Sequence, residues 1–165
     1  MKKTFLFLML CIMSMTSIAQ VSFSKFKLVT DNPLGCCPGR KALEYKFTNT
    51  GDRALKYVNI YYYAVNAVGD VISGATHATI RVGAEELVKP RLVQNTGPFE
   101  PGKSQSGWIS ALLYADKRTT VIPFQLEIVY MGENEPTFIT IDKDNIGTYF
   151  PKVKWVDYNR VNRAI

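Results

Sequence analysis

The chain has 165 residues, with 20 Lys and Arg against 14 Asp and Glu and a formal net charge of +6. This length suffices for one ordinary domain with a real core. The positive charge is mild and lacks the clustered basic stripe of a nucleic-acid-binding protein. We therefore expect one folded domain and no nucleic-acid partner.

The first twenty residues have the three-part layout of a secretory signal peptide. Residues 1–3 read MKK, residues 4–18 are almost all apolar or small, and Ser17 and Ala19 are small residues at the positions that a signal peptidase reads. The apolar stretch is shorter than the roughly 20 residues of a membrane-spanning helix. We expect residues 1–19 to be removed, leaving a mature chain with no transmembrane anchor in a periplasmic, outer-surface or secreted location.

The predicted mature chain has two cysteines, Cys36 and Cys37, and they are neighbours. They cannot join distant parts of a fold, because their Cα atoms lie about 3.8 Å apart and a relaxed disulfide spans about 5.5 Å. A strained vicinal disulfide, two free thiols and pairing between chains are the alternatives. The pair is a candidate redox site, and a redox-responsive protein is an alternative function.

Short strands separated by turns are predicted along the mature chain. Residues 42–49 alternate between apolar and polar side chains, as a half-buried strand does. Residues 55–66 are dense in β-branched and aromatic residues and give the strongest strand prediction. Further strands are predicted over residues 24–30, 78–82, 87–94, 103–109, 121–130 and 137–142.

Three local patterns refine these strands. Pro90 lies within the predicted strand 87–94, which makes that strand an edge or a bulged one. Residues 95–102 read NTGPFEPG and predict a rigid connection. In the strand 121–130, strict alternation places Phe124 on the same face as Leu126.

Tyr57, Tyr61 and Tyr63 share one face of the predicted strand 55–66, and the other face is also apolar. An apolar strand of this kind is expected at the centre of a sheet. The three tyrosines belong either to the core or to a solvent-facing stripe that would bind a sugar or a protein partner. They are the candidate ligand-binding residues.

These patterns predict an all-β fold, an immunoglobulin-like antiparallel β-sandwich of seven to eight strands. No alternation of strands and helices is present, so a parallel sheet is not expected. The predicted sandwich domain spans residues 20–149, and residues 150–165 form a basic C-terminal tail. The alternatives for this tail are an extra strand or frayed terminus packed through Trp155, and a basic helix lying on a partner or an anionic surface.

Several short strings in order along the chain support this fold. They are LKYV at 55–58, NAVGD at 66–70, TGP at 96–98 followed by EPG at 100–102, and EIVYM at 127–131. Together they resemble a group of uncharacterised bacterial exported domains with an immunoglobulin-like sandwich. The resemblance covers roughly residues 42–142 and lacks the Asp usual after the YM pair. It implies a fold and no activity.

The inventory of catalytic and metal-binding residues is poor. His77 is the one histidine, so a Ser-His or Cys-His arrangement would have to use it, and no Ser lies in a G-x-S-x-G turn. Zinc needs about four ligands, and residues 142–147 begin like a calcium loop without completing one. We expect no catalytic residues, no metal and no cofactor. The function expected is a non-enzymatic module that binds a protein or glycan at the cell envelope, with an enzyme of unknown type as a further alternative.

Overall fold

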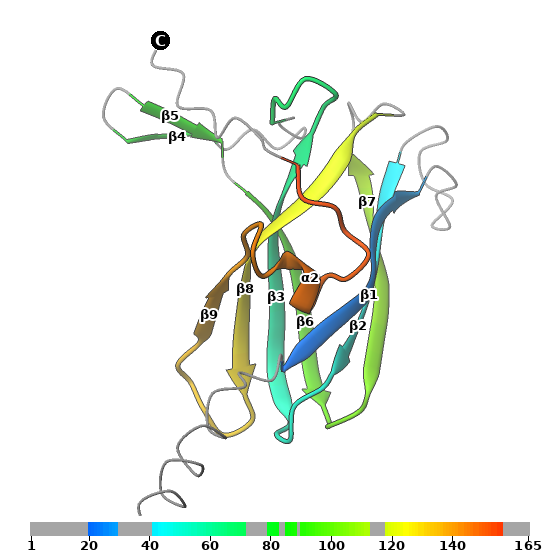
Figure 1. The fold of residues 1–165 in the computed structure, drawn as a ribbon. Helices are drawn as coiled ribbons and strands as arrows, with labels where there is room; N and C mark the ends of the chain where they lie inside the picture. The colour runs from blue at the N-terminus through cyan, green and yellow to red at the C-terminus, as the bar shows by residue number, and fades with distance from the viewer. Residues whose placement is uncertain are drawn as a thin grey trace, which may run out of the picture.

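The computed structural model describes residues 20–29, 41–71, 79–82, 85–88, 90–112 and 118–156. Within these ranges seven strands form two antiparallel sheets (Figure 1). The first sheet has the order β1-β2-β7, with β1 at Val21–Val29, β2 at Lys41–Asn49 and β7 at Ser104–Leu112. The second has the order β6-β3-β8-β9, with β6 at Arg91–Phe99, β3 at Leu55–Val65, β8 at Thr120–Tyr130 and β9 at Thr137–Thr140.

The predicted all-β sandwich is confirmed. The first, second and fifth of the seven strands share one sheet, and the other four share the second, an arrangement of the immunoglobulin-like type. The strand β3 lies at the centre of its sheet between β6 and β8, as its apolar sequence predicts. A separate hairpin pairs β4 (Thr79–Val82) with β5 (Glu85–Val88), and a short helix α2 spans Ile146–Tyr149.

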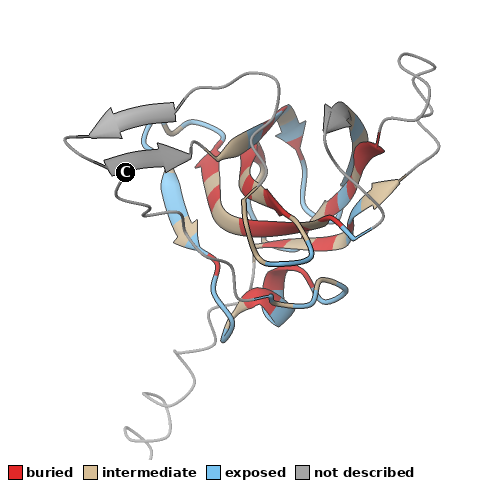
Figure 2. Cartoon of the chain, turned by 90° about the horizontal axis from the view of Figure 1, so that it is seen from above, coloured by how far each residue is buried: buried red, intermediate tan, exposed pale blue. Residues whose placement is uncertain are grey.

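The core lies between the two sheets, where buried residues of facing strands meet (Figure 2). Along β3 the residues Val58, Ile60 and Tyr62 are at most 1% exposed, and their neighbours in the chain point to the other side of the sheet. Phe23 and Phe47 contribute from the opposing sheet, with ring centroids 5.6 Å apart. The two-residue period of these strands therefore fixes which face of each sheet is covered.

The segment 141–156 follows β9 and closes the side of the sandwich at which β1 and β8 approach each other (Figure 1). Ile141 donates a backbone hydrogen bond to Phe124, and Phe150 stacks on Phe23 with ring centroids 4.3 Å apart. Val153 and Trp155 also pack against the core. In the turn before α2, the Asp142 carboxylate accepts hydrogen bonds from two backbone N–H groups, so this polar stretch forms a turn as expected.

The structure corrects the prediction in three places. Pro90 lies between β5 and β6 rather than within one strand, because proline has no N–H for a sheet ladder. The strand β6 continues through Phe99, so residues 95–99 are not a connection. A Cβ at Gly97 would lie 2.4 Å from the Leu55 carbonyl oxygen, so the close approach of two strands requires glycine there. The third place is Phe124, which lies on the outer face of its sheet rather than in the core.

No helix among the described residues is long and apolar enough to cross a membrane. Residues 1–19, which carry the predicted signal peptide, lie outside the described ranges.

Candidate functional site

The three predicted tyrosines lie on the outer face of the four-stranded sheet. Because Val58, Ile60 and Tyr62 point into the core, alternation along β3 turns Tyr57, Tyr61 and Tyr63 outward. All three are partly buried rather than fully exposed. The structure thus places them together on one surface, in the centre of a sheet.

The pairing of the strands shows which residues surround the tyrosines. Tyr61 lies opposite Leu92 of β6 and Gln125 of β8. The next row of paired residues across the strands contains Asn59, which lies opposite Gln94 and Glu127. In the same row Glu127 lies opposite Phe138 of β9. We call this surface the aromatic face and define it by Tyr57, Asn59, Tyr61, Tyr63, Leu92, Gln94, Phe124, Gln125, Glu127 and Phe138.

Phe124 joins the aromatic face through a bulge. The register of β3 on β8 shifts between Tyr61 and Tyr62, which leaves Phe124 as an extra residue on β8. Its ring stacks on Tyr63 with centroids 4.9 Å apart and meets Tyr61 at 6.2 Å in a T-shaped contact. The prediction that Phe124 shares the core face with Leu126 is therefore wrong, because alternation holds only where no residue is inserted. The three rings hold one another in fixed positions on the sheet.

A carboxylate and a phenol lie side by side on the aromatic face. The Tyr61 hydroxyl donates a hydrogen bond of 2.6 Å to Glu127 Oε2. This hydrogen bond, with partial burial and the negative charge of Glu127 as smaller causes, raises the pKa of Tyr61 to about 12. The bond orients Glu127 and leaves its second carboxylate oxygen available to accept further hydrogen bonds.

The titration of Tyr61 tests this geometry. The folded protein keeps the phenol proton up to a pKa of about 12, against 10.0 for an ordinary tyrosine, so the stabilising bond is present below pH 10 and lost as the pH rises through 12. Glu127→Gln removes the charge and is expected to lower the pKa of Tyr61 toward 10.0. The readout is an NMR titration of labelled tyrosine rings. Glu133→Gln, whose carboxylate pairs with Arg53, serves as the control and should leave the Tyr61 titration unchanged.

Asn59 is the most buried polar side chain of the aromatic face. It is 8% exposed, and its side-chain oxygen accepts no hydrogen bond from any residue that the structure describes. A buried acceptor without a donor costs roughly 1–3 kcal/mol. Asn59 lies in the central strand between Tyr57 and Tyr61. Its oxygen is covered in the observed orientation, so a bound molecule with a hydroxyl or amide donor would satisfy it after the side-chain amide turns outward.

The outer face of the other sheet is different in character. Glu44 accepts a hydrogen bond of 2.6 Å from Lys25 and lies 3.6 Å from Lys27. The bond from Lys25 is the main cause of the lowered pKa of Glu44. Trp108, which is 44% exposed, lies opposite Glu44 in the neighbouring strand. On this surface the Glu44 carboxylate is already paired with Lys25 and Lys27. The aromatic face instead combines aromatic rings with polar groups that can bind a ligand.

Sequence reasoning found the three tyrosines and missed their neighbours. Asn59, Glu127 and Phe138 come from three strands, and only the register of those strands brings them into one row. The alternating Gln125 and Glu127 pattern marked the outward positions of β8 but did not say which residues of β3 they face. The outward position of Phe124 was harder to predict, since nothing in its local sequence indicates a bulge.

The other predicted site residues are not placed by the structure. Cys36, Cys37 and His77 lie outside the described residues, so the redox hypothesis stays a prediction. In the described part of the chain, no group of three or more His, Cys, Asp or Glu residues is arranged to hold a metal ion.

Comparison with protein-family models, with curated proteins and with solved structures gives no match to this chain. The function is therefore argued from the chemistry of the aromatic face alone.

Proposed function

We propose that this chain is an exported, non-enzymatic β-sandwich module that binds a glycan through the aromatic face. The observation that carries this proposal is the buried Asn59 oxygen without a hydrogen-bond donor at the centre of a surface lined by aromatic rings. The support for export is the N-terminal sequence pattern, and the resemblance to exported immunoglobulin-like domains agrees with it.

A sugar matches the chemistry of this surface in two respects. The C–H faces of a pyranose ring pack on aromatic rings, and Tyr57, Tyr61 and Phe138 offer rings at or near the surface. The hydroxyl groups of a sugar both donate and accept hydrogen bonds. They would donate to the Glu127 carboxylate, accept from the Gln94 amide, and donate to the Asn59 oxygen once its side-chain amide has turned outward.

A glycan is favoured over a protein partner by the mixture of groups in each row. The buried centre of a protein interface is depleted in charged residues and built around apolar anchors. Here the row through Asn59 contains Gln94 and Glu127 and ends at the exposed Phe138 in the edge strand β9. The exposed Leu92 lies in the neighbouring row, in the other edge strand. Polar groups at the centre with rings beside them favour a ligand that is rich in hydroxyls.

Asn59→Leu is the sharpest test of this proposal. The substitution keeps the size of the side chain and removes the acceptor, so we expect affinity for a bound glycan to fall by about tenfold or more, since one lost hydrogen bond to a buried group costs roughly 1–3 kcal/mol. The same change removes a buried unpaired acceptor and should not destabilise the fold. The purified protein would be screened on a glycan array, and each hit titrated by calorimetry.

Tyr57→Ala is expected to weaken binding of the same glycan. Trp108→Ala, on the opposite sheet, is expected to leave that binding unchanged. The proposal fails if no glycan binds saturably, or if binding depends on Trp108 and not on Asn59.

A further inference from the structure

The strand β7 is an edge of the three-stranded sheet. It pairs with β2 on one side, and no other segment that the structure describes pairs with its second side, which we call the free edge (Figure 1). Ser104, Gln105 and Ser106 are exposed there, and Trp108 is 44% exposed. The backbone N–H and C=O groups along such an edge can bond to another strand. The free edge is therefore a candidate site for an added strand.

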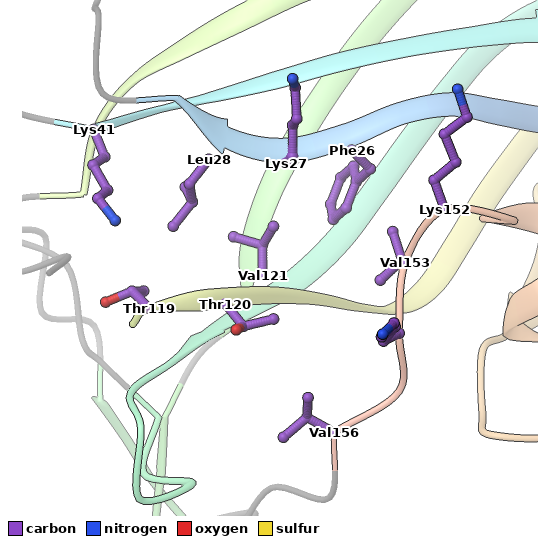
Figure 3. Close-up of a pocket in the computed structure, with 11 residues that line it drawn as sticks. Phe26, Lys27, Leu28, Lys41, Thr119, Thr120, Val121, Lys152, Val153 and Val156 are labelled. Atoms are coloured by element: carbon purple, nitrogen blue, oxygen red, sulfur yellow. The ribbon is translucent and has the colours of Figure 1, made fainter. Parts of the chain in front are cut away.

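The remaining edges of the sandwich are protected in ways that β7 is not. The C-terminal segment lies along β1, where Phe150 stacks on Phe23 and where residues of both segments are among those that line a pocket of about 420 Å³ (Figure 3). The strand β1 also has a bulge and two lysines, β6 contains Pro98, and β9 has four residues. Bulges, charges, proline and short length are the devices by which proteins prevent edge pairing. The strand β7 has nine residues with neither a charge nor a proline.

The hydrogen bonds at the start of β7 show which backbone groups point to the free edge. The Asn49 N–H donates to the Lys103 carbonyl at 2.9 Å, and the register of β2 on β7 is regular from there to Gly107. Because the backbone groups of an antiparallel strand alternate between its two sides, every second residue from Lys103 onward bonds to β2. The residues between them point their N–H and C=O groups to the free edge: Ser104, Ser106 and Trp108.

The Ser106 carbonyl agrees with this assignment. It accepts a hydrogen bond of 3.2 Å from the side chain of Gln105 rather than from β2. This bond is exposed to solvent, so the Gln105 amide can exchange it for water when another strand takes its place.

We propose that β7 pairs antiparallel with β7 of a second copy of this chain, about a two-fold axis at Ser106. In this register Ser106 lies opposite the same residue of the second copy, and Trp108 lies opposite Ser104. The N–H and C=O groups of the two free edges then bond to one another, and the two three-stranded sheets become one continuous sheet.

The side chains along β7 fit this register. On the outer face the large Trp108 lies opposite the small Ser104, and on the inner face Gln105 lies opposite Gly107, which has no side chain. Since β7 contains no charged residue, the two-fold axis brings no like charges opposite each other within the strand. A charged strand of another protein would find no complementary charge in β7. The aromatic face lies on the other sheet, so the pairing leaves it open for a ligand.

Sedimentation velocity of the purified protein over a series of concentrations tests the proposal. We expect a dimer that increases with concentration, and no larger species, because a two-fold contact is closed. Ser106→Lys places two like charges opposite each other and should weaken dimerisation at least about tenfold. Ser106→Glu should do the same, and an equal mixture of the two variants should restore the dimer. Ser106 is exposed, so both variants should fold normally, which circular dichroism checks.

Thr140→Lys is the matched control. Thr140 is also exposed and lies in the edge strand β9 of the other sheet, with its N–H pointing away from β8 because the next residue, Ile141, donates to β8. We expect this variant to dimerise as the unchanged protein does. Undiminished dimerisation by Ser106→Lys, or a mixture no stronger than either variant alone, would overturn the proposal. A monomer at every concentration would also overturn it and would leave the free edge to a strand of another protein.

Discussion

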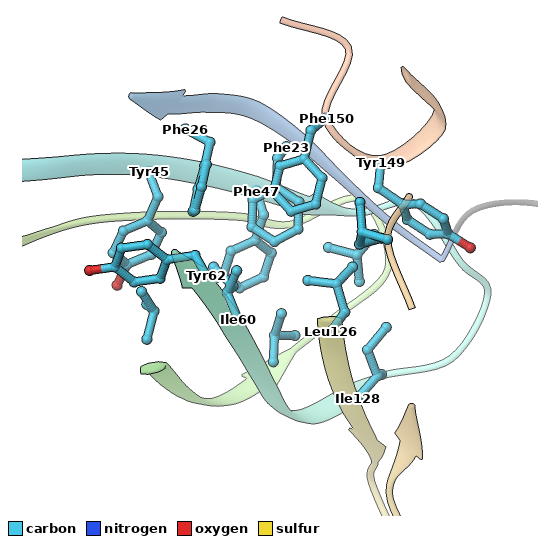
Figure 4. Packing of buried hydrophobic residues seen from close by; sticks show 14 of the residues in the cluster. Phe23, Phe26, Tyr45, Phe47, Ile60, Tyr62, Leu126, Ile128, Tyr149 and Phe150 are labelled. Carbon is cyan, nitrogen blue, oxygen red and sulfur yellow. The ribbon is translucent and has the colours of Figure 1, made fainter. Parts of the chain in front are cut away.

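Replacing Phe150 by alanine is expected to lower the free energy of unfolding by about 3–5 kcal/mol, the usual cost of deleting a buried phenylalanine ring. Phe150 is 0% exposed. Its ring stacks on Phe23 at 4.3 Å and meets Phe26 edge-on at 5.2 Å (Figure 4). The substitution would leave a cavity between β1 and the C-terminal segment, and it would remove the main apolar anchor of that segment.

Urea denaturation followed by circular dichroism measures this effect. Phe138→Ala is a matched control, because Phe138 is 57% exposed in β9 and its removal should cost less than about 1 kcal/mol. If Phe150→Ala costs no more than Phe138→Ala, then the C-terminal segment does not pack on the core as described.

Asn49→Ala is expected to destabilise the protein by about 2–4 kcal/mol, because it removes the side-chain partner of one buried and two partly buried backbone groups. Asn49 is 0% exposed at the end of β2. Its side-chain N–H groups donate to the carbonyl oxygens of Arg53 at 2.8 Å and Phe99 at 2.9 Å, and its side-chain oxygen accepts from the Gly51 N–H at 3.0 Å. The side chain therefore ties the β2–β3 turn to the end of β6, joining the two sheets at one end of the sandwich.

Asn66→Ala provides the control, since Asn66 caps a turn in a similar way but in a more exposed place. Its side-chain oxygen accepts from the N–H groups of Val68 at 3.0 Å and Asp70 at 2.9 Å. Water can replace these bonds, so we expect a loss of less than about 1 kcal/mol. Thermal unfolding of both variants gives the comparison, and equal losses would show that Asn49 acts only as a local turn cap.

The fold class was predictable because its signals are local. Alternation along residues 42–49, the aromatic and β-branched residues of β3, and frequent turn residues each indicate strands without reference to the rest of the chain. The central position of β3 followed from its two apolar faces. Which face of β3 is buried could not be predicted. The sequence alone does not show that Val58, Ile60 and Tyr62 face the core while the tyrosines of the other face line an outer surface.

The details that were missed depend on contacts between distant segments. Gly97 and Pro98 look like a connection in the sequence, yet both lie in β6, where the Leu55 carbonyl approaches Gly97 too closely for a side chain. Phe124 faces outward because of a register shift against β3. Asn59 is an unremarkable residue of a strand until the register places it beside Gln94 and Glu127 and burial isolates its oxygen.

The most direct test of the central claim is a ¹⁵N NMR titration of the protein with the best glycan from the array. If the aromatic face binds the glycan, the largest shift changes fall on the Asn59 and Gln94 side-chain amides and on the backbone of β3 and β8, and they disappear in Asn59→Leu. Shift changes centred on Trp108 and β7, or unaltered in Asn59→Leu, would contradict the proposed binding face.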